Sequence, residues 1–139
     1  MCEVGEYGAA DSLRMPRIGC DLADVTAVEE SITHFGERYL TRVYSAEERF
    51  QTGEAAERLA ARFAGKEAVL KVLRRSGDIR YPEIEILNDG DGAPQVHLSA
   101  RARRVAAEQQ LGPIAISLSH ERGLALATAV ALARDPRQL

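Results

Sequence analysis

One stretch of the sequence, residues 54–75, constrains the fold most, because its apolar side chains recur with the period of a long helix. On a helical projection, five large apolar residues fall on one broad arc that we expect to face the core: Leu59, Phe63, Val69, Leu70 and Leu73. Arg62 and Lys66 lie within this arc, and Glu67 lies at its edge, one turn before Lys71. Charged side chains rarely occupy a core face without partners, so this helix is also the first place to look for a functional site.

The helix alone leaves two interpretations of its charges open. In the first, the basic side chains lie over apolar surface with their charged ends in water, and Glu67 and Lys71 form an ordinary helical ion pair. In the second, two cations and a carboxylate point into a cleft that holds an anion and a metal ion.

The segments around this helix predict an α+β fold with an antiparallel sheet. Apolar and polar residues alternate over residues 18–22, 84–86, 96–98 and 114–119, and residues 124–132 form an apolar strand. The turn-rich run 88–94 predicts a hairpin. Further helices are expected over residues 25–50, with a break at Gly36 and a capping box at Ser45 and Glu48, and over residues 100–111.

Length and composition are those of one globular domain. The chain has 139 residues, of which 45% are hydrophobic and 28% charged. We expect residues 1–15 to form a flexible N-terminal tail and residues 16–139 to form the domain. The net charge of −3 and the absence of a basic arm exclude a nucleic-acid-binding class.

The sequence also predicts a cytoplasmic protein without a membrane segment. The longest apolar run, residues 123–133, is too short to span a bilayer, and the first 14 residues lack the apolar core of a secretory signal. Cys2 and Cys20 are not spaced as a metal site, and they indicate free thiols in a reducing compartment.

Two polar positions outside the long helix are further site candidates. Asp21 lies on the non-core face of the first predicted strand, where a solvated carboxylate is the ordinary interpretation. Packed beside Glu67, it would complete a pair of carboxylates suited to Mg²⁺. His120 ends the strand row of Ile116 and Leu118, where it is either a structural histidine or a ligand for phosphate.

These segments, in this order, resemble the holo-[acyl-carrier-protein] synthase family of 4′-phosphopantetheinyl transferases. Residues 18–22 (Ile-Gly-Cys-Asp-Leu) are similar to the opening strand with its metal-binding Asp, and residues 62–68 (Arg-Phe-Ala-Gly-Lys-Glu-Ala), followed by Lys71, are similar to the hallmark helix. Residues 92–94 and 117–120 match later segments. The likeness runs from about Ile18 to Leu132, and it implies the family's fold, an antiparallel sheet with a long central helix.

The resemblance implies transfer of 4′-phosphopantetheine from coenzyme A to a serine of an acyl carrier protein, with release of 3′,5′-ADP. It makes Asp21, Glu67 and Lys71 the catalytic residues. Asp21 and Glu67 would hold Mg²⁺ against the coenzyme A pyrophosphate, and Lys66 and Lys71 would add positive charge. Glu67, directly or through a water, is the candidate base for the serine hydroxyl.

The resemblance also implies a coenzyme A site and an assembly. The coenzyme A-binding residues would be Arg62, Lys66, Gly92, Pro94, Ser119 and His120. The family forms homotrimers with active sites between subunits. The apolar strand 124–132 is compatible with a sheet buried by a neighbouring subunit, although a sheet covered by its own chain would have the same sequence pattern.

One segment departs from the family. In the family, the first helix carries basic residues that meet the acidic recognition helix of the carrier. In this chain the corresponding residues 25–30 include Glu29 and Glu30, and basic residues follow only at Arg38 and Arg42. We therefore expect a narrower carrier preference, such as a carrier of a polyketide or other secondary pathway. The alternatives are a catalytically weak coenzyme A or nucleotide-binding module and a small trimeric interaction domain.

Overall fold

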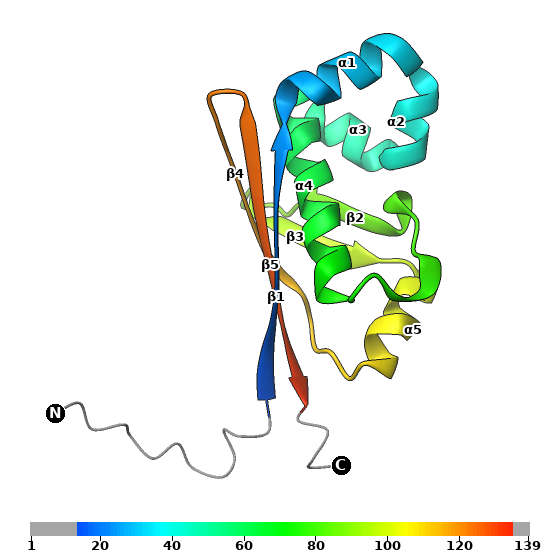
Figure 1. The fold of residues 1–139 in the computed structure, drawn as a ribbon, viewed down its shortest axis with the longest axis vertical. Coiled ribbons are helices and arrows are strands. Elements are labelled where there is room, and N and C mark those ends of the chain that lie inside the picture. The colour runs from blue at the N-terminus through cyan, green and yellow to red at the C-terminus, as the bar shows by residue number, and fades with distance from the viewer. Residues whose placement is uncertain (1–13, 135–139) are drawn as a thin grey trace, which may run out of the picture.

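Among the described residues, the first and last strands pair with each other along their whole length (Figure 1). The structure is a computed structural model that describes residues 14–134. Its elements follow in the order β1 (Arg14–Asp24), α1 (Val25–Phe35), α2 (Glu37–Val43), α3 (Ala46–Thr52), α4 (Ala56–Val72), η2 (Ser76–Asp78), η3 (Tyr81–Glu83), β2 (Ile84–Asn88), β3 (Pro94–Leu98), α5 (Ala100–Glu108), β4 (Ala115–Glu121) and β5 (Leu124–Arg134).

The strands form two antiparallel sheets. One has three strands in the order β1-β5-β4, and the other is the two-stranded hairpin of β2 and β3. The register of β1 and β5 runs from Arg14 opposite Arg134 to Asp24 opposite Leu124. The predicted α+β class and the antiparallel pairing are therefore confirmed.

Helix α4 is the centre of the molecule. Figure 1 shows it between the three-stranded sheet on one side and the β2-β3 hairpin with α3 on the other. Because it is covered from both sides, it buries more than the predicted arc, including small residues on its other faces: Ala60, Ala61, Ala64, Ala68 and Val72. The helix ends at Val72, earlier than predicted, because Arg74 and Arg75 adopt left-handed backbone conformations with φ of 55° and 50°.

Two glycines allow strands to approach α4 closely. A Cβ atom on Gly19 of β1 would lie 1.9 Å from the carbonyl oxygen of Ala68. A Cβ atom on Gly65 of α4 would lie 2.3 Å from Cδ1 of Ile86 on β2. The Gly19 contact is with backbone and therefore requires the absence of a side chain, whereas a Cβ atom at Gly65 would force the end of the Ile86 side chain to move.

The predicted faces of the first strand are reversed, because Ile18 and Leu22 are exposed while Asp21, opposite the buried Ala127, lies on the side of α4. Most other local signals of the sequence are reproduced. Gly36 separates α1 from α2, and Ser45 and Glu48 form the predicted capping box of α3. β1 begins at Arg14, so Arg14 and Met15 belong to the strand and not to the predicted tail, while residues 1–13 lie outside the described residues. α5 ends at Glu108, short of the predicted Leu111. Within residues 14–134, no helix is long and apolar enough to cross a membrane.

Candidate active site

Asp21 and Lys71 meet where β1 crosses α4. The Lys71 ammonium nitrogen, Nζ, lies 3.2 Å from Asp21 Oδ1 and 2.6 Å from the carbonyl oxygen of Cys20. The helical pair between Lys71 and Glu67, one of the two interpretations of these charges, is therefore replaced by a tertiary ion pair that joins the strand to the helix.

Glu67, one turn before Lys71, is held by two other residues. The Tyr81 hydroxyl donates to Glu67 Oε1 at 2.6 Å, and Arg75 Nη2 donates to Glu67 Oε2 at 2.6 Å. Burial by itself raises the pKa of Glu67, but the hydrogen bonds from Tyr81 and Arg75 and the charge of Lys71 outweigh burial, so that the pKa is lowered overall. Glu67 is therefore an ionised, oriented carboxylate at neutral pH.

The two carboxylates share their cationic surroundings. Lys71 is paired with Asp21 and also lowers the pKa of Glu67, while the pKa of Arg75 is raised chiefly by its hydrogen bond with Glu67 and to a smaller degree by Asp21. Asp21, Glu67, Lys71 and Arg75 thus form one group, which we call the carboxylate group.

The carboxylate group supplies the kind of ligand that Mg²⁺ takes. Residues 14–134 contain no set of three or more His, Cys, Asp or Glu side chains arranged to hold a metal ion. Mg²⁺ commonly binds one or two carboxylates and completes its shell with waters and phosphate oxygens. Two carboxylates that leave positions open for waters and phosphate oxygens therefore fit this ion and would not form a closed, all-protein metal site.

Arg62 lies on another side of α4, because it precedes Glu67 by five residues, or about 140° of helical rotation. Its side chain is 6% exposed, and its Nη2 donates to Asn88 Oδ1 at 3.1 Å. Arg62 Nε is buried without a hydrogen-bond partner in the described part of the chain. An unsatisfied buried donor is costly, and an anionic ligand would satisfy it.

The β2-β3 turn lies beside Arg62. Asn88 is opposite Pro94 in the hairpin, so the predicted Gly92–Pro94 segment is held near the guanidinium. Gly92 has a φ of 82°, which an L-residue rarely adopts, and this explains its place in the turn.

Ser119 and His120 point to opposite faces of the sheet. His120 is opposite the buried Ala125, on the side of α4, and its Nδ1 lies 3.9 Å from Glu57 Oε2 in the first turn of that helix. Ser119 is opposite Leu126 on the exposed face. His120 and Arg62 both lie along the N-terminal part of α4, whereas Ser119 faces away from them.

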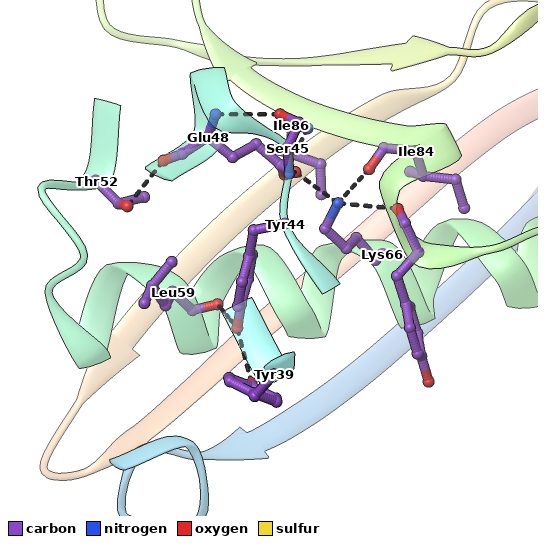
Figure 2. Close-up of polar contacts among 10 residues, drawn as sticks. Tyr39, Tyr44, Ser45, Glu48, Thr52, Leu59, Lys66, Ile84 and Ile86 are labelled. Atoms are coloured by element: carbon purple, nitrogen blue, oxygen red, sulfur yellow. Dashed lines mark hydrogen bonds and ion pairs between the residues drawn. The ribbon is translucent and has the colours of Figure 1, made fainter. Parts of the chain in front are cut away.

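Lys66 is not at this surface, and its predicted contact with coenzyme A does not fit its position. It is fully buried and donates three hydrogen bonds, to Glu48 Oε1 at 2.7 Å and to the carbonyl oxygens of Tyr81 and Ile84 at 3.0 and 2.5 Å (Figure 2). An ammonium has three N–H donors, so none remains for a phosphate. Neither of the two interpretations drawn from the helix describes this residue.

Glu48 completes the buried pair. Its Oε2 accepts from the backbone N–H of Ile86 at 3.0 Å, and its Oε1 also accepts from Ser45 N at 3.0 Å (Figure 2). Burial lowers the pKa of Lys66, and the nearby Glu48 carboxylate opposes this effect. The pair therefore joins α3, α4 and β2 from inside.

Sequence reasoning missed several residues of the site. Arg75 and Tyr81 contact Glu67 but belong to no motif that the sequence displays, and Asn88, which contacts Arg62, was identified only as part of the turn-rich run 88–94. Glu48 was identified only as a capping residue. Except for the contact between Arg75 and Glu67, these contacts join residues at least 14 positions apart. The spacing of residues along a helix or strand gives no information about contacts over such separations.

Comparison with known proteins agrees with this geometry. The family model described as the 4′-phosphopantetheinyl transferase superfamily matches residues 17–129. The chain belongs to this superfamily. The match begins in β1 and ends in β5, so it covers every element of the phosphopantetheinyl transferase that carries a site residue.

Curated phosphopantetheinyl transferases are similar over nearly their whole length. The holo-[acyl-carrier-protein] synthase of Chloroflexus aggregans is 39% identical over 129 residues, covering 81% of this chain and 92% of that protein. The holo-[acyl-carrier-protein] synthase of Dehalococcoides mccartyi is 37% identical over 113 residues, covering 81% of this chain and 95% of that protein.

Solved structures share the fold. The crystal structure of Helicobacter pylori holo-[acyl-carrier-protein] synthase in complex with coenzyme A has a TM-score of 0.75 at 27% identity, covering 82% of this chain and 98% of that one. The holo-[acyl-carrier-protein] synthase of Plasmodium yoelii has a TM-score of 0.76 at 27% identity, covering 88% of this chain and 98% of that one. The predicted family and fold are confirmed.

Proposed function

We propose that this phosphopantetheinyl transferase is a holo-[acyl-carrier-protein] synthase, which transfers 4′-phosphopantetheine from coenzyme A to a serine of an acyl carrier protein and releases 3′,5′-ADP. The observation that carries the proposal is the carboxylate group, in which Asp21 and Glu67 come from distant segments and share the charge of Lys71. The names of the relatives and the coenzyme A in the Helicobacter pylori structure support the activity and the substrate.

The reaction is a displacement at phosphorus. The serine oxygen of the carrier forms a bond to the phosphorus on the pantetheine side of the pyrophosphate, and the bond from this phosphorus to the bridging oxygen breaks. The bridging oxygen and its electron pair leave with 3′,5′-ADP, and the serine proton must go to a base. A site for this reaction needs positive charge for the pyrophosphate and one carboxylate for the proton.

Asp21 and Glu67 would hold Mg²⁺, which would neutralise the charge that builds on the pyrophosphate oxygens. Lys71, which contacts Asp21 and the carbonyl oxygen of Cys20 on β1, would add a second positive charge. The Glu67 carboxylate, directly or through a water, would accept the serine proton, and the Tyr81 hydroxyl would keep that carboxylate oriented through its hydrogen bond to Oε1.

Arg62 and His120 would bind the phosphates of coenzyme A. The unpartnered Nε of Arg62 is the support for this assignment, since a phosphate oxygen would satisfy it. Gly92 and Pro94, beside Asn88, would border the nucleotide. Ser119 could reach a ligand only from the exposed face of the sheet.

We further propose a homotrimer with active sites between subunits. The outer face of the β1-β5-β4 sheet carries a row of exposed apolar side chains, with Ile18 62% and Leu22 60% exposed on β1, and Leu126 and Leu132 on β5. Exposed apolar surface of this kind marks protein interfaces. Within one chain, Arg62 and the carboxylate group lie on different sides of α4. In a trimer, Arg62 of one subunit could lie near the carboxylate group of its neighbour.

The carrier would be a specialised one, such as a carrier of a polyketide pathway. Glu29 and Glu30 are exposed on α1, whereas Arg38 and Arg42 are exposed on α2. An acidic carrier helix is repelled by the first pair and attracted by the second, so docking would shift toward α2.

Incubation with an apo carrier protein, coenzyme A and Mg²⁺ tests the activity, with the mass of the carrier as the readout. We expect a mass gain of one phosphopantetheine, release of 3′,5′-ADP, and loss of both after addition of EDTA. No mass gain on any apo carrier would contradict the proposed function. Competition between fatty-acid-type and polyketide-type carriers tests the preference, and equal rates on both would remove the specialisation alone.

A further inference from the structure

Arg75 donates a hydrogen bond to one of the two carboxylate oxygens of Glu67. Its Nη2 lies 2.6 Å from Glu67 Oε2, while the other oxygen, Oε1, accepts from Tyr81. In a continued helix, Arg75 would lie about 12 Å along the axis from Glu67, too far for a direct neighbour. The contact therefore depends on the backbone that follows α4.

That backbone is folded back by a strained turn. Arg74 and Arg75 both have positive φ, and the N–H of Arg75 donates to the carbonyl of Leu70 at 2.8 Å. Left-handed conformations are unfavourable for residues with a side chain and cluster at functional sites. Here the turn returns a guanidinium to the helix that carries Glu67.

Arg75 has room to leave this position, whereas Tyr81 has less. The Arg75 side chain is 56% exposed and lines a cavity of 610 Å³ together with Arg42 and Arg80. Tyr81 packs its ring against Phe63 at 5.5 Å between centroids, and its carbonyl accepts from the buried Lys66. Removal of Arg75 would free Glu67 Oε2 without releasing Glu67 from Tyr81.

We propose that Arg75 is a positioning residue that holds Glu67 before the metal arrives and competes with the divalent ion for Glu67 Oε2. The inference rests on the proposed function, in which Glu67 is a metal ligand. A guanidinium and a divalent cation on one carboxylate oxygen repel each other, so Arg75 opposes metal binding at Glu67 Oε2 unless it turns toward the cavity. The protein therefore binds the metal ion more weakly than it would if Arg75 were absent.

Direct titration of the metal-free protein with Mn²⁺, followed by the electron paramagnetic resonance of free Mn²⁺, tests the competition without any activity measurement. We expect Arg75→Gln to tighten Mn²⁺ binding about threefold to tenfold, the range of one partly exposed, charged hydrogen bond. Arg74→Gln is the matched control, since Arg74 has the same charge and a left-handed backbone, with φ of 55° against 50° for Arg75. Thermal melting of each variant establishes that it is folded.

Unchanged or weaker binding in Arg75→Gln would overturn the inference, and so would equal tightening in Arg74→Gln, which would reflect net charge alone. Glu67→Gln separates this inference from the proposed function. If Glu67→Gln abolishes Mn²⁺ binding but Arg75→Gln has no effect, only the role of Arg75 fails. If Glu67→Gln binds Mn²⁺ as the wild type does, the metal assignment and the role of Arg75 both fail.

Discussion

Gly19 lies directly against the backbone of Ala68, so closely that a Cβ atom at position 19 would be 1.9 Å from the Ala68 carbonyl oxygen. This contact sets the distance between β1 and α4. Two residues further along β1, Asp21 reaches Lys71, which is one turn beyond Glu67. The geometry of the carboxylate group therefore depends on a residue that has no side chain.

Gly19→Ala is expected to destabilise the protein by about 3 kcal/mol, the upper part of the usual range for overpacking, because β1 is held by its pairing with β5 and α4 is packed from both sides. Chemical denaturation measures the free energy of unfolding. Gly90→Ala is the control, since a Cβ atom there meets no atom within 4 Å. Equal stability of the two variants would show that β1 and α4 are not in contact at Gly19.

Glu67→Gln is expected to lower the rate of transfer to the carrier about 100-fold or more while leaving the fold intact, because the amide is a poor proton acceptor and a poor metal ligand. The amide oxygen can still accept from Tyr81, so stability should change by about 1 kcal/mol or less. Glu47→Gln, on the exposed side of α3, serves as the control for the loss of one charge. Near-normal turnover of Glu67→Gln would contradict the proposed mechanism.

Lys66→Met is expected to destabilise the protein by about 3–5 kcal/mol, because it leaves the buried Glu48 carboxylate without its counter-charge. The double variant Lys66→Met/Glu48→Gln removes both charges and keeps an oxygen for the N–H of Ile86, so it should recover part of the loss. The free energies of unfolding of Lys66→Met, Glu48→Gln and the double variant, together with that of the wild type, form a double-mutant cycle. Additive effects would mean that the two side chains do not interact.

Glu83 gives a prediction for pH. Hydrogen bonds from Arg101, the backbone N–H of Arg80 and Ser99 lower the pKa of Glu83 from 4.5 to about 2. A carboxyl whose pKa is lower in the folded state contributes stability above its unfolded pKa, and this contribution is lost as the pH falls from about 4.5 to about 2. Because the pair with Arg101 is near the surface, we expect a contribution of less than about 1 kcal/mol.

The measurement is the free energy of unfolding at a series of pH values for the wild type and for Glu83→Gln. The difference between the two proteins should shrink as the pH falls through this range, and 1 M salt should reduce it further at neutral pH. Two parallel curves would mean that Glu83 has the same pKa in both states.

Leu22→Glu is expected to dissociate the proposed trimer, because it places a charge on the apolar outer face of the sheet, where Leu22 is 60% exposed. Phe50→Glu is the control, since Phe50 is an exposed apolar residue of α3, away from the sheet. Sedimentation velocity reports the assembly of each. A wild-type chain that sediments as a monomer at all concentrations would exclude the trimer.

The sequence by itself determined the features that depend on neighbours along the chain. The period of α4, the break at Gly36 and the capping box of Ser45 and Glu48 arise from residues within a few positions of one another. The likeness to the family also pointed to Asp21 and Glu67 as candidate site residues, because each lies within a short motif. Interactions between residues close together along the chain can be predicted directly from the sequence.

The tertiary structure alone decided which charges meet. Lys66 and Lys71 lie on the same helix and look equivalent in the sequence, yet one is buried against Glu48 and the other reaches Asp21, 50 positions away. The difference follows from which strand or helix docks at each turn of α4, and docking is set by the shapes of surfaces formed by distant segments. The helical period of the sequence predicts the direction in which a side chain leaves its helix. The partner that it meets in that direction depends on how the distant segments pack.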